Sequence, residues 1–191
     1  PSGTDPAAIL VADLNGDELP DAAVGGNSMA VLLNNGDGTL NAPVSIPDAP
    51  SHVLALAGQD LNGDGAVDLA VAHPNVVTVM INSGDGQFRD IRISRVGVTP
   101  IAIGIGFLDD DSNLDLVTAN RGTNDVSVLS GTGDGSFAAE SRLKVGKGPV
   151  ALGIGDLNAD GQDDLVTANR NESFGSGTVT VNTGGELVVS N

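Results

Sequence analysis

The chain is organised around residues 60–68, which read Asp-Leu-Asn-Gly-Asp-Gly-Ala-Val-Asp. Oxygen-bearing side chains occupy positions 1, 3, 5 and 9 of this nine-residue stretch, and glycine occupies position 6. A hard cation such as Ca²⁺ takes six to eight oxygen ligands, and a glycine allows the sharp bend with positive φ that a tight loop needs. The backbone carbonyl at position 7 can add another oxygen. The stretch therefore predicts a calcium-binding loop.

The same pattern occurs four times along the chain. The residues at position 1 are 13, 60, 107 and 156, so successive copies are 47, 47 and 49 residues apart. A fixed period of 20–50 residues indicates a repeat architecture. The third copy differs because Phe107 stands at position 1. The candidate side-chain ligands are Asp13, Asn15, Asp17 and Asp21; Asp60, Asn62, Asp64 and Asp68; Asp109, Asp111 and Asp115; and Asp156, Asn158, Asp160 and Asp164.

The net charge of the 191-residue chain is −17, and twelve of its 21 aspartates stand at candidate ligand positions of the four loops. Four bound Ca²⁺ ions would bring the charge to −9. Acidity of this kind, with eight scattered Lys and Arg residues, makes nucleic acid and anionic membranes unsuitable partners. The absence of cysteine excludes disulfides and thiol chemistry. No apolar stretch is long enough to predict membrane insertion.

Each repeat follows one order of segments. An apolar run precedes the loop, a second apolar strand follows it, and an Asn- and Gly-rich turn leads to a β-branched third strand. Asp-Gly hairpin turns then lead to a more polar fourth strand, predicted at Phe88–Ser94 in the second repeat and Phe137–Leu143 in the third. Four strands per 47 residues are typical of β-propeller blades. We expect an all-β chain of four four-stranded antiparallel repeats in a single domain, 1–191, with blades at about 5–51, 52–98, 99–147 and 148–191.

Two alternative architectures fit less well. The rungs of a β-solenoid are shorter than this period. An EF-hand needs a carboxylate at loop position 12, whereas these loops have Val24, Val71, Thr118 and Thr167 there and no flanking helical pattern.

The loops, the Asp-Leu-x-x-Ala segments after them, and Gly-Asp-Gly-x-Phe at 84–88 and 133–137 resemble the FG-GAP/VCBS repeats of integrin-α-type β-propellers. The resemblance implies that each loop joins the first two strands of a blade. It also implies that Ca²⁺ is bound through the side chains at positions 1, 3, 5 and 9 and the position-7 carbonyl. Members of this family usually close a ring of seven blades, so four blades imply part of a larger propeller, an assembly completed by a partner chain, or an unusual small ring. The implied carbonyl ligands are those of Leu19, Ala66, Asn113 and Gln162.

The sequence favours structural calcium, with three to four ions, over a catalytic metal. A catalytic metal needs an exchangeable position and a nearby acid or base, and no such partner recurs beside the loops. The two histidines, His52 and His73, belong to no recognisable triad. We therefore expect a non-enzymatic, calcium-binding module for protein interaction, adhesion or scaffolding, secreted or displayed at the cell surface by bacterial-type export, where calcium is abundant.

Two alternatives for the function stay open. The first is a carbohydrate-binding lectin, although the chain lacks the Trp and Tyr on which sugar rings usually stack. The second is a non-catalytic propeller fragment of a larger secreted enzyme. The protein or glycan ligand is not identified. The repeated pairs at 120–121 and 169–170, Asn-Arg in both, could contact a ligand, or be turn residues with asparagine in the left-handed region.

The third loop is expected to bind calcium most weakly. Phe107 removes one anionic oxygen, and Ser112 replaces the glycine at position 6, where we expect a left-handed backbone that costs about 1 kcal/mol. Asp109 offers a carboxylate where the other loops have asparagine, which would compensate in part.

Overall fold

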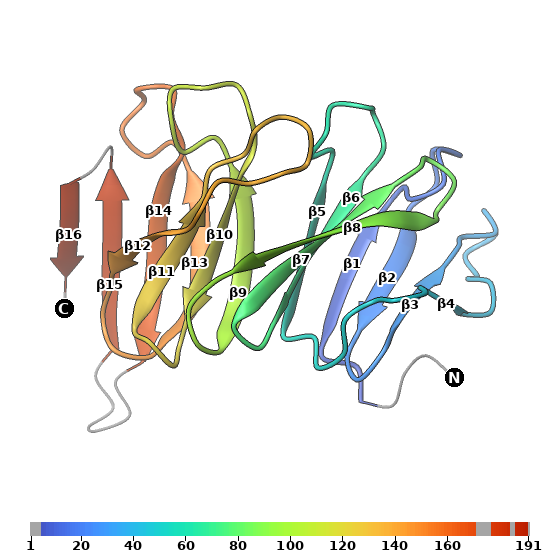
Figure 1. Cartoon of the computed structure of the whole chain (residues 1–191), viewed down its shortest axis with the longest axis horizontal. Coiled ribbons are helices and arrows are strands. Elements are labelled where there is room, and N and C mark those ends of the chain that lie inside the picture. Colours follow the sequence, from blue (N-terminus) through green and yellow to red (C-terminus); the bar gives the residue numbers. More distant parts are fainter. Residues whose placement is uncertain (1–4, 171–176, 184–185, 191) are drawn as a thin grey trace.

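The structure is a computed structural model, and it describes residues 5–170, 177–183 and 186–190. These residues form sixteen strands in four antiparallel sheets of four strands each, and in every sheet the strands pair in chain order. Each strand is thus hydrogen-bonded to the one that follows it within its repeat (Figure 1). The predicted all-β propeller with four four-stranded blades is confirmed.

The four blades have the following strands. The first contains β1 (Ala8–Ala12), β2 (Asp21–Gly25), β3 (Met29–Leu32) and β4 (Val44–Ser45). The second contains β5 (Ala55–Gln59), β6 (Asp68–His73), β7 (Val76–Asn82) and β8 (Phe88–Arg95). The third contains β9 (Pro100–Gly106), β10 (Asp115–Asn120), β11 (Asp125–Leu129) and β12 (Ser141–Lys144). The fourth contains β13 (Pro149–Gly155), β14 (Asp164–Arg170), β15 (Gly177–Thr183) and β16 (Glu186–Ser190).

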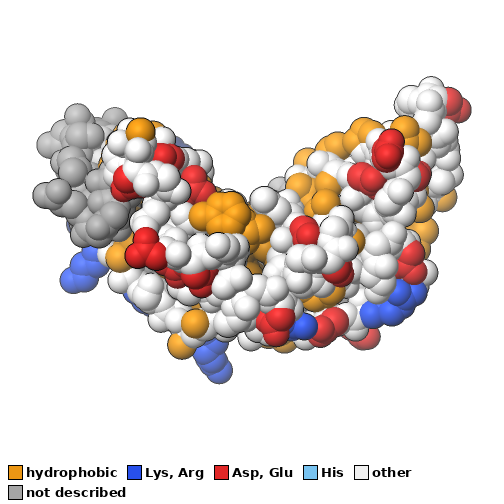
Figure 2. Space-filling model, turned by 90° about the horizontal axis from the view of Figure 1, so that it is seen from above, with side chains coloured by type: hydrophobic (Ala, Val, Ile, Leu, Met, Phe, Trp, Pro, Cys, Tyr) orange, Lys and Arg blue, Asp and Glu red, His pale blue; other side chains and the backbone are white. Residues whose placement is uncertain are grey.

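The blades stand side by side in chain order, with the first and fourth at opposite ends of the molecule (Figure 1). The first strands of successive blades, β1, β5, β9 and β13, are neighbours. Seen from above, the molecule is an arc with a hollow on one side (Figure 2). The four blades therefore form an open segment of a propeller.

The hydrophobic core lies between facing blades. Leu14, Val31, Leu69 and Met80 belong to one buried cluster that spans the first two blades. Further clusters join the second blade to the third and the third to the fourth. The second strands of the two middle blades, β6 and β10, are buried over almost their whole length, and so their apolar residues do not alternate with exposed polar ones.

The outer strands differ most from the prediction. β8 lies close to the predicted segment, but β12 begins at Ser141 instead of Phe137, and Phe137 makes only an isolated bridge to Gly131. β4 has only two residues. These strands lie at the exposed edge of each blade, where packing contributes little to their pairing. The connection between β15 and β16 in the fourth blade falls partly outside the described residues.

Candidate metal-binding loops

The four predicted loops lie along one edge of the arc. Each connects the first strand of a blade to the second, and antiparallel pairing in chain order brings these connections to the same edge. This is the upper edge in Figure 1 and the face seen in Figure 2, where acidic side chains are distributed across the surface. The predicted side-chain ligands of each loop are therefore gathered within that loop, and the four loops share one face.

In the second loop, the position-1 carboxylate is the centre around which the backbone folds. Oδ1 of Asp60 accepts the backbone N–H of Gly63 at 2.7 Å, and Oδ2 accepts that of Gly65 at 2.8 Å. Gly63 and Gly65 have φ angles of 77° and 90°, in the left-handed region. Asp13 and Asp156 accept the equivalent N–H groups in their own loops. The backbone thus turns its amides toward position 1.

Two residues of the first and fourth loops adopt this backbone without being glycine. Glu18 has φ of 67° at position 6 of the first loop, and Ala159 has φ of 61° at position 4 of the fourth. A left-handed conformation costs a residue with a Cβ roughly 1 kcal/mol. The contacts of the position-1 carboxylate must offset this cost.

The side chains at positions 3 and 5 also turn into the loop. Oδ1 of Asn62 accepts the N–H of Asp64 at 3.0 Å, and the Asn62 side-chain amide donates to Oδ2 of Asp64 at 2.8 Å. Oδ1 of Asp64 accepts the N–H of Ala66 at 2.9 Å. The first and fourth loops repeat all three contacts. In each of these three loops, the side chains at positions 1, 3 and 5 therefore fold back onto the same short turn of backbone.

The aspartate at position 9 has a structural role that the sequence analysis did not identify. Asp68 is fully buried; its Oδ2 accepts the N–H of Leu61 at 2.9 Å, and its Oδ1 accepts the N–H of Asn82 at 2.8 Å. Asp21 and Asp115 make the equivalent pair of bonds. This carboxylate fastens the loop to the end of the third strand. The recurrence of aspartate at the start of every second strand could have indicated this role.

Asp164 makes half of this pattern among the described residues. Its Oδ2 accepts the N–H of Leu157 at 2.7 Å, whereas its buried Oδ1 has no hydrogen-bond partner in the described part of the chain. By strand register, the residue equivalent to Asn82 is at position 184, which lies outside the described residues.

The acidic groups of a loop repel one another. Burial raises the pKa of Asp68, and the charges of Asp64 and Asp60 act in the same direction. Burial likewise raises the pKa of Asp115, with smaller contributions from Asp109 and Asp111. In the other direction, backbone hydrogen bonds, above all that from Gly161, lower the pKa of Asp156. A cation between the carboxylates would remove the repulsion.

The donors fit calcium by their chemistry. The candidate side-chain ligands offer carboxylate and carboxamide oxygens, which are ligands that Ca²⁺ prefers. Across the described residues, however, no three His, Cys, Asp or Glu side chains are arranged to hold a metal ion. The loop oxygens instead accept backbone N–H groups. Ion binding in these loops would therefore require the side chains to shift toward a common centre.

A family model of FG-GAP-like repeats matches residues 60–107 and 108–167, which is more than half of the chain. The chain belongs to the FG-GAP-like repeat family. A search of curated proteins found no significant match.

Solved structures share the fold of this FG-GAP-like chain. An Agrocybe aegerita lectin, described as specific for non-reducing terminal N-acetylglucosamine, is 21% identical, with a TM-score of 0.58 over 94% of this chain and 50% of the lectin. BBS1N, solved in complex with ARL6DN, is 13% identical, with a TM-score of 0.66 over 98% of this chain and 54% of that chain. The Photorhabdus luminescens Tc holotoxin pore is 18% identical, with a TM-score of 0.56 over 95% of this chain and 9% of that chain. This chain thus spans about half the length of the first two.

The third FG-GAP-like loop has a different backbone from the others. Neither Asp110 nor Ser112, at positions 4 and 6, has a positive φ, so the left-handed backbone predicted for Ser112 is wrong. Phe107 has no carboxylate to collect the loop amides. Its own N–H donates to Oδ2 of Asp163 at 2.9 Å, and its carbonyl accepts the N–H of Asp163 at 2.8 Å. The third loop is therefore tied to the fourth loop through position 1, while Asp109 and Asp111 still accept N–H groups of their own loop.

The repeated asparagines of the FG-GAP-like blades are buried and do not form an exposed ligand surface. The Asn120 side-chain amide donates to Oδ1 of Asp125 and to Oγ of Ser127, both at 2.9 Å. The Asn169 amide donates to Oγ1 of Thr180 at 3.0 Å. Neither asparagine has the positive φ proposed for a turn residue. Both satisfy buried polar groups at the lower ends of their blades.

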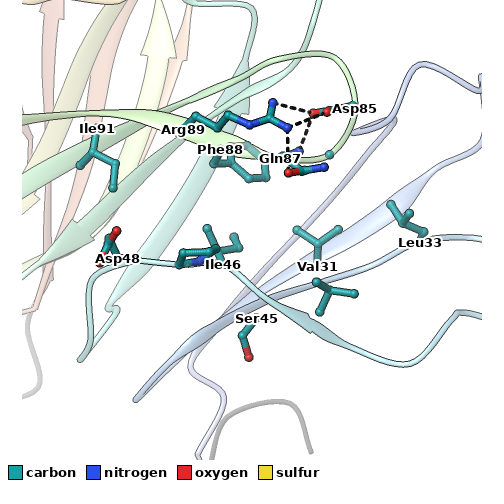
Figure 3. A pocket seen from close by; sticks show the side chains of 13 residues that line it. Val31, Leu33, Ser45, Ile46, Asp48, Asp85, Gln87, Phe88, Arg89 and Ile91 are labelled. Atoms are coloured by element: carbon teal, nitrogen blue, oxygen red, sulfur yellow. Dashed lines mark hydrogen bonds and ion pairs between the residues drawn. The ribbon is translucent and has the colours of Figure 1, made fainter.

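A groove of about 720 Å³ separates the outer parts of the first and second blades. Val31 and Ile46 line one wall, and Phe88 and Arg89 line the other (Figure 3). Arg89 is folded back onto Asp85, with N–O distance 3.0 Å, and onto Gln87. The strand register explains why the groove exists: Val44 occupies the place that Arg92 has in the second blade. Arg92 bridges to Oγ of Ser136 in the third blade at 2.8 Å, whereas Val44 forms no such bridge.

Proposed function

We propose that this chain is a calcium-stabilised interaction module that acts outside the cell and binds three to four structural Ca²⁺ ions. The recurrence of oxygen-bearing side chains at positions 1, 3 and 5 of three loops, all folded onto one short turn of backbone, carries the proposal. The mutual repulsion of the loop carboxylates adds to it, because binding a cation there would stabilise the folded state. Asp13, Asp60 and Asp156, with their position-3 and position-5 neighbours, would be the main ligands.

A non-catalytic role agrees with the fold, since FG-GAP-like propeller repeats are typically non-catalytic. Such repeats are also typical of extracellular proteins, where calcium is abundant enough to fill weak sites. Within the described residues, no helix has the length and hydropathy needed to cross a membrane. The protein or glycan that the module binds would be recognised by its blade surfaces.

Calorimetric titration with Ca²⁺ and Mg²⁺ tests the metal sites. We expect Ca²⁺ to bind at three or four sites and Mg²⁺ much more weakly, because Mg²⁺ requires near-ideal octahedral geometry and loses its waters reluctantly. The double variant Asp60→Asn/Asp64→Asn should lose one site. The matched control Asp85→Asn/Asp134→Asn removes the same charge from two hairpin turns and should keep every site. Equal loss of calcium binding in both variants would show that the binding depends only on the net charge of the chain.

A lectin is the second candidate, favoured by the fold shared with the Agrocybe aegerita lectin. The absence of Trp and Tyr weighs against it. A glycan array that includes non-reducing terminal N-acetylglucosamine decides between the candidates. Specific binding inhibited by the free sugar would support the lectin, and no binding to any glycan would leave the protein-interaction module.

A further inference from the structure

The two end blades of the arc present complementary apolar surfaces. The pattern is set by the interface between the third and fourth blades. There, Leu152 and Ile154 of β13 pack against Gly104 and Gly106 of β9. A Cβ added at Gly104 would lie 2.7 Å from the Cδ1 atoms of both Leu152 and Ile154. Glycine is therefore required for the two large side chains to seat.

The face of the fourth blade that points away from the third carries the same pair of glycines, and we call this glycine face the receiving surface. Gly153 and Gly155 hold the same places in β13 as Gly104 and Gly106 do in β9, because all four precede the loop by three residues or one. A Cβ added at Gly153 or Gly155 would meet no atom within 4 Å. Ala151, on the same face, is exposed. The receiving surface is formed but has no occupant among the described residues.

The first blade carries the matching pair of large apolar side chains on its own free face. Ile9 and Val11 of β1 hold the places of Leu152 and Ile154, four and two residues before the loop. Their neighbours Ala8, Leu10 and Ala12 pack toward the second blade, so Ile9 and Val11 point to the free face. They are 66% and 62% exposed. Two large apolar side chains side by side at this exposure are typical of an interface.

We propose that the first blade of one copy of this chain docks on the fourth blade of a second copy, with Ile9 and Val11 seated over Gly153 and Gly155. The first and fourth blades lie at opposite ends of the arc (Figure 1), so one copy cannot join its own ends. A head-to-tail contact closes a ring when the rotation allows it. Two arcs joined at both ends make eight blades, and propellers typically have four to eight. The contact uses blade faces and no loop residue, so it does not depend on the calcium proposal.

Sedimentation velocity over a range of concentrations tests the contact, in calcium-containing buffer at physiological ionic strength. The wild-type chain should sediment with the mass of two copies. Ile9→Ser/Val11→Ser should dissociate at concentrations roughly tenfold higher or more, since two apolar side chains lose their burial. Gly153→Val should also weaken the pair although it adds apolar surface, because it fills the receiving site. Val44→Ser, which removes a valine 65% exposed on the outer groove, is the matched control and should leave the mass unchanged.

Mixing the two defective variants tests the head-to-tail arrangement. The Gly153→Val chain keeps its Ile9 and Val11, and the Ile9→Ser/Val11→Ser chain keeps its open glycines. Together they should form a one-to-one pair at concentrations where neither variant associates alone, because the mixed pair contains one contact with both intact surfaces. A wild-type chain that stays monomeric at every concentration overturns the proposal and leaves these faces to blades of another chain. A dimer that is unaffected by both sets of substitutions also overturns it.

Discussion

Asp64 and Asp85 make nearly the same contact with the backbone. Oδ1 of Asp64 accepts the N–H of Ala66 at 2.9 Å, and Oδ1 of Asp85 accepts the N–H of Gln87 at 3.1 Å. They differ in their surroundings, because Asp64 faces Asp60 and Asn62 in a loop, whereas Asp85 pairs with Arg89 in a hairpin turn. A role in calcium binding can therefore be separated from a role in the turn.

We expect Asp64→Ala to reduce the calcium-dependent part of the unfolding free energy by about 1–3 kcal/mol, since it removes a charged ligand. Asp85→Ala should cost much less, as an exposed ion pair contributes little. Chemical denaturation of both variants, with calcium and with chelator, measures the difference. If the two variants lose equal stability under both conditions, the loops are ordinary turns.

The buried aspartate at position 9 leads to a different expectation. Asp115 accepts two N–H groups, from Leu108 and Gly131, each at 2.9 Å. Asp115→Asn keeps only one acceptor oxygen and should cost roughly 1–3 kcal/mol, with or without calcium, because one buried N–H is left unpaired. Asp111→Asn, which keeps the oxygen facing the N–H of Asn113, is the control. A loss that appears only with calcium would mean that position 9 acts through the ion instead.

The loops differ from blade to blade in ways that should set their affinity for calcium. The third loop lacks both the position-1 carboxylate and the left-handed residues of the other loops. We therefore predict that it binds most weakly and that the second loop binds most tightly. Directly excited europium luminescence, measured in Asp109→Ala and Asp60→Ala chains, compares the two loops. The larger loss of high-affinity signal should come from Asp60→Ala, and the reverse result would mean that position 1 is dispensable.

A further prediction concerns the groove between the outer parts of the first and second blades. Arg92→Val would give the interface of the second and third blades the valine that the first blade has at Val44. We expect a groove to open there, increased binding of an apolar dye, and about 1 kcal/mol less stability, because the bond to Ser136 is lost. Arg95→Val, which removes an exposed arginine of the same strand that does not line the groove, should not increase dye binding. Equal dye binding by the two variants would show that Arg92 does not seal the interface.

The sequence predicts the repeated, local features of the molecule well and its interfaces poorly. The loop pattern and the Asp-Gly turns establish four blades, because each is fixed by residues close in the chain. The backbone of Ser112 was predicted wrongly because its conformation follows the position-1 carboxylate, which accepts the position-6 N–H in the other loops and is missing at Phe107. The short β4 and the late start of β12 follow from exposed edges that leave no burial pattern. Gly104 and Gly106 do mark the packing of blades, but only register shows which side chain each one receives.

At the scale of the whole molecule, four loops on one edge would act together. Each cation would stabilise only the folded chain, by about 2.7 kcal/mol at a concentration one hundred times its dissociation constant. The four blades share continuous clusters of buried side chains, so stabilising the loops of one blade also supports its neighbours.

Thermal unfolding of the wild-type chain in calcium, in magnesium and in chelator measures whether calcium stabilises the four blades. We predict that the midpoint falls by roughly 10 °C or more when calcium is removed, that added calcium restores it, and that magnesium restores little of it. The same midpoint in all three conditions would contradict the claim that calcium stabilises the array.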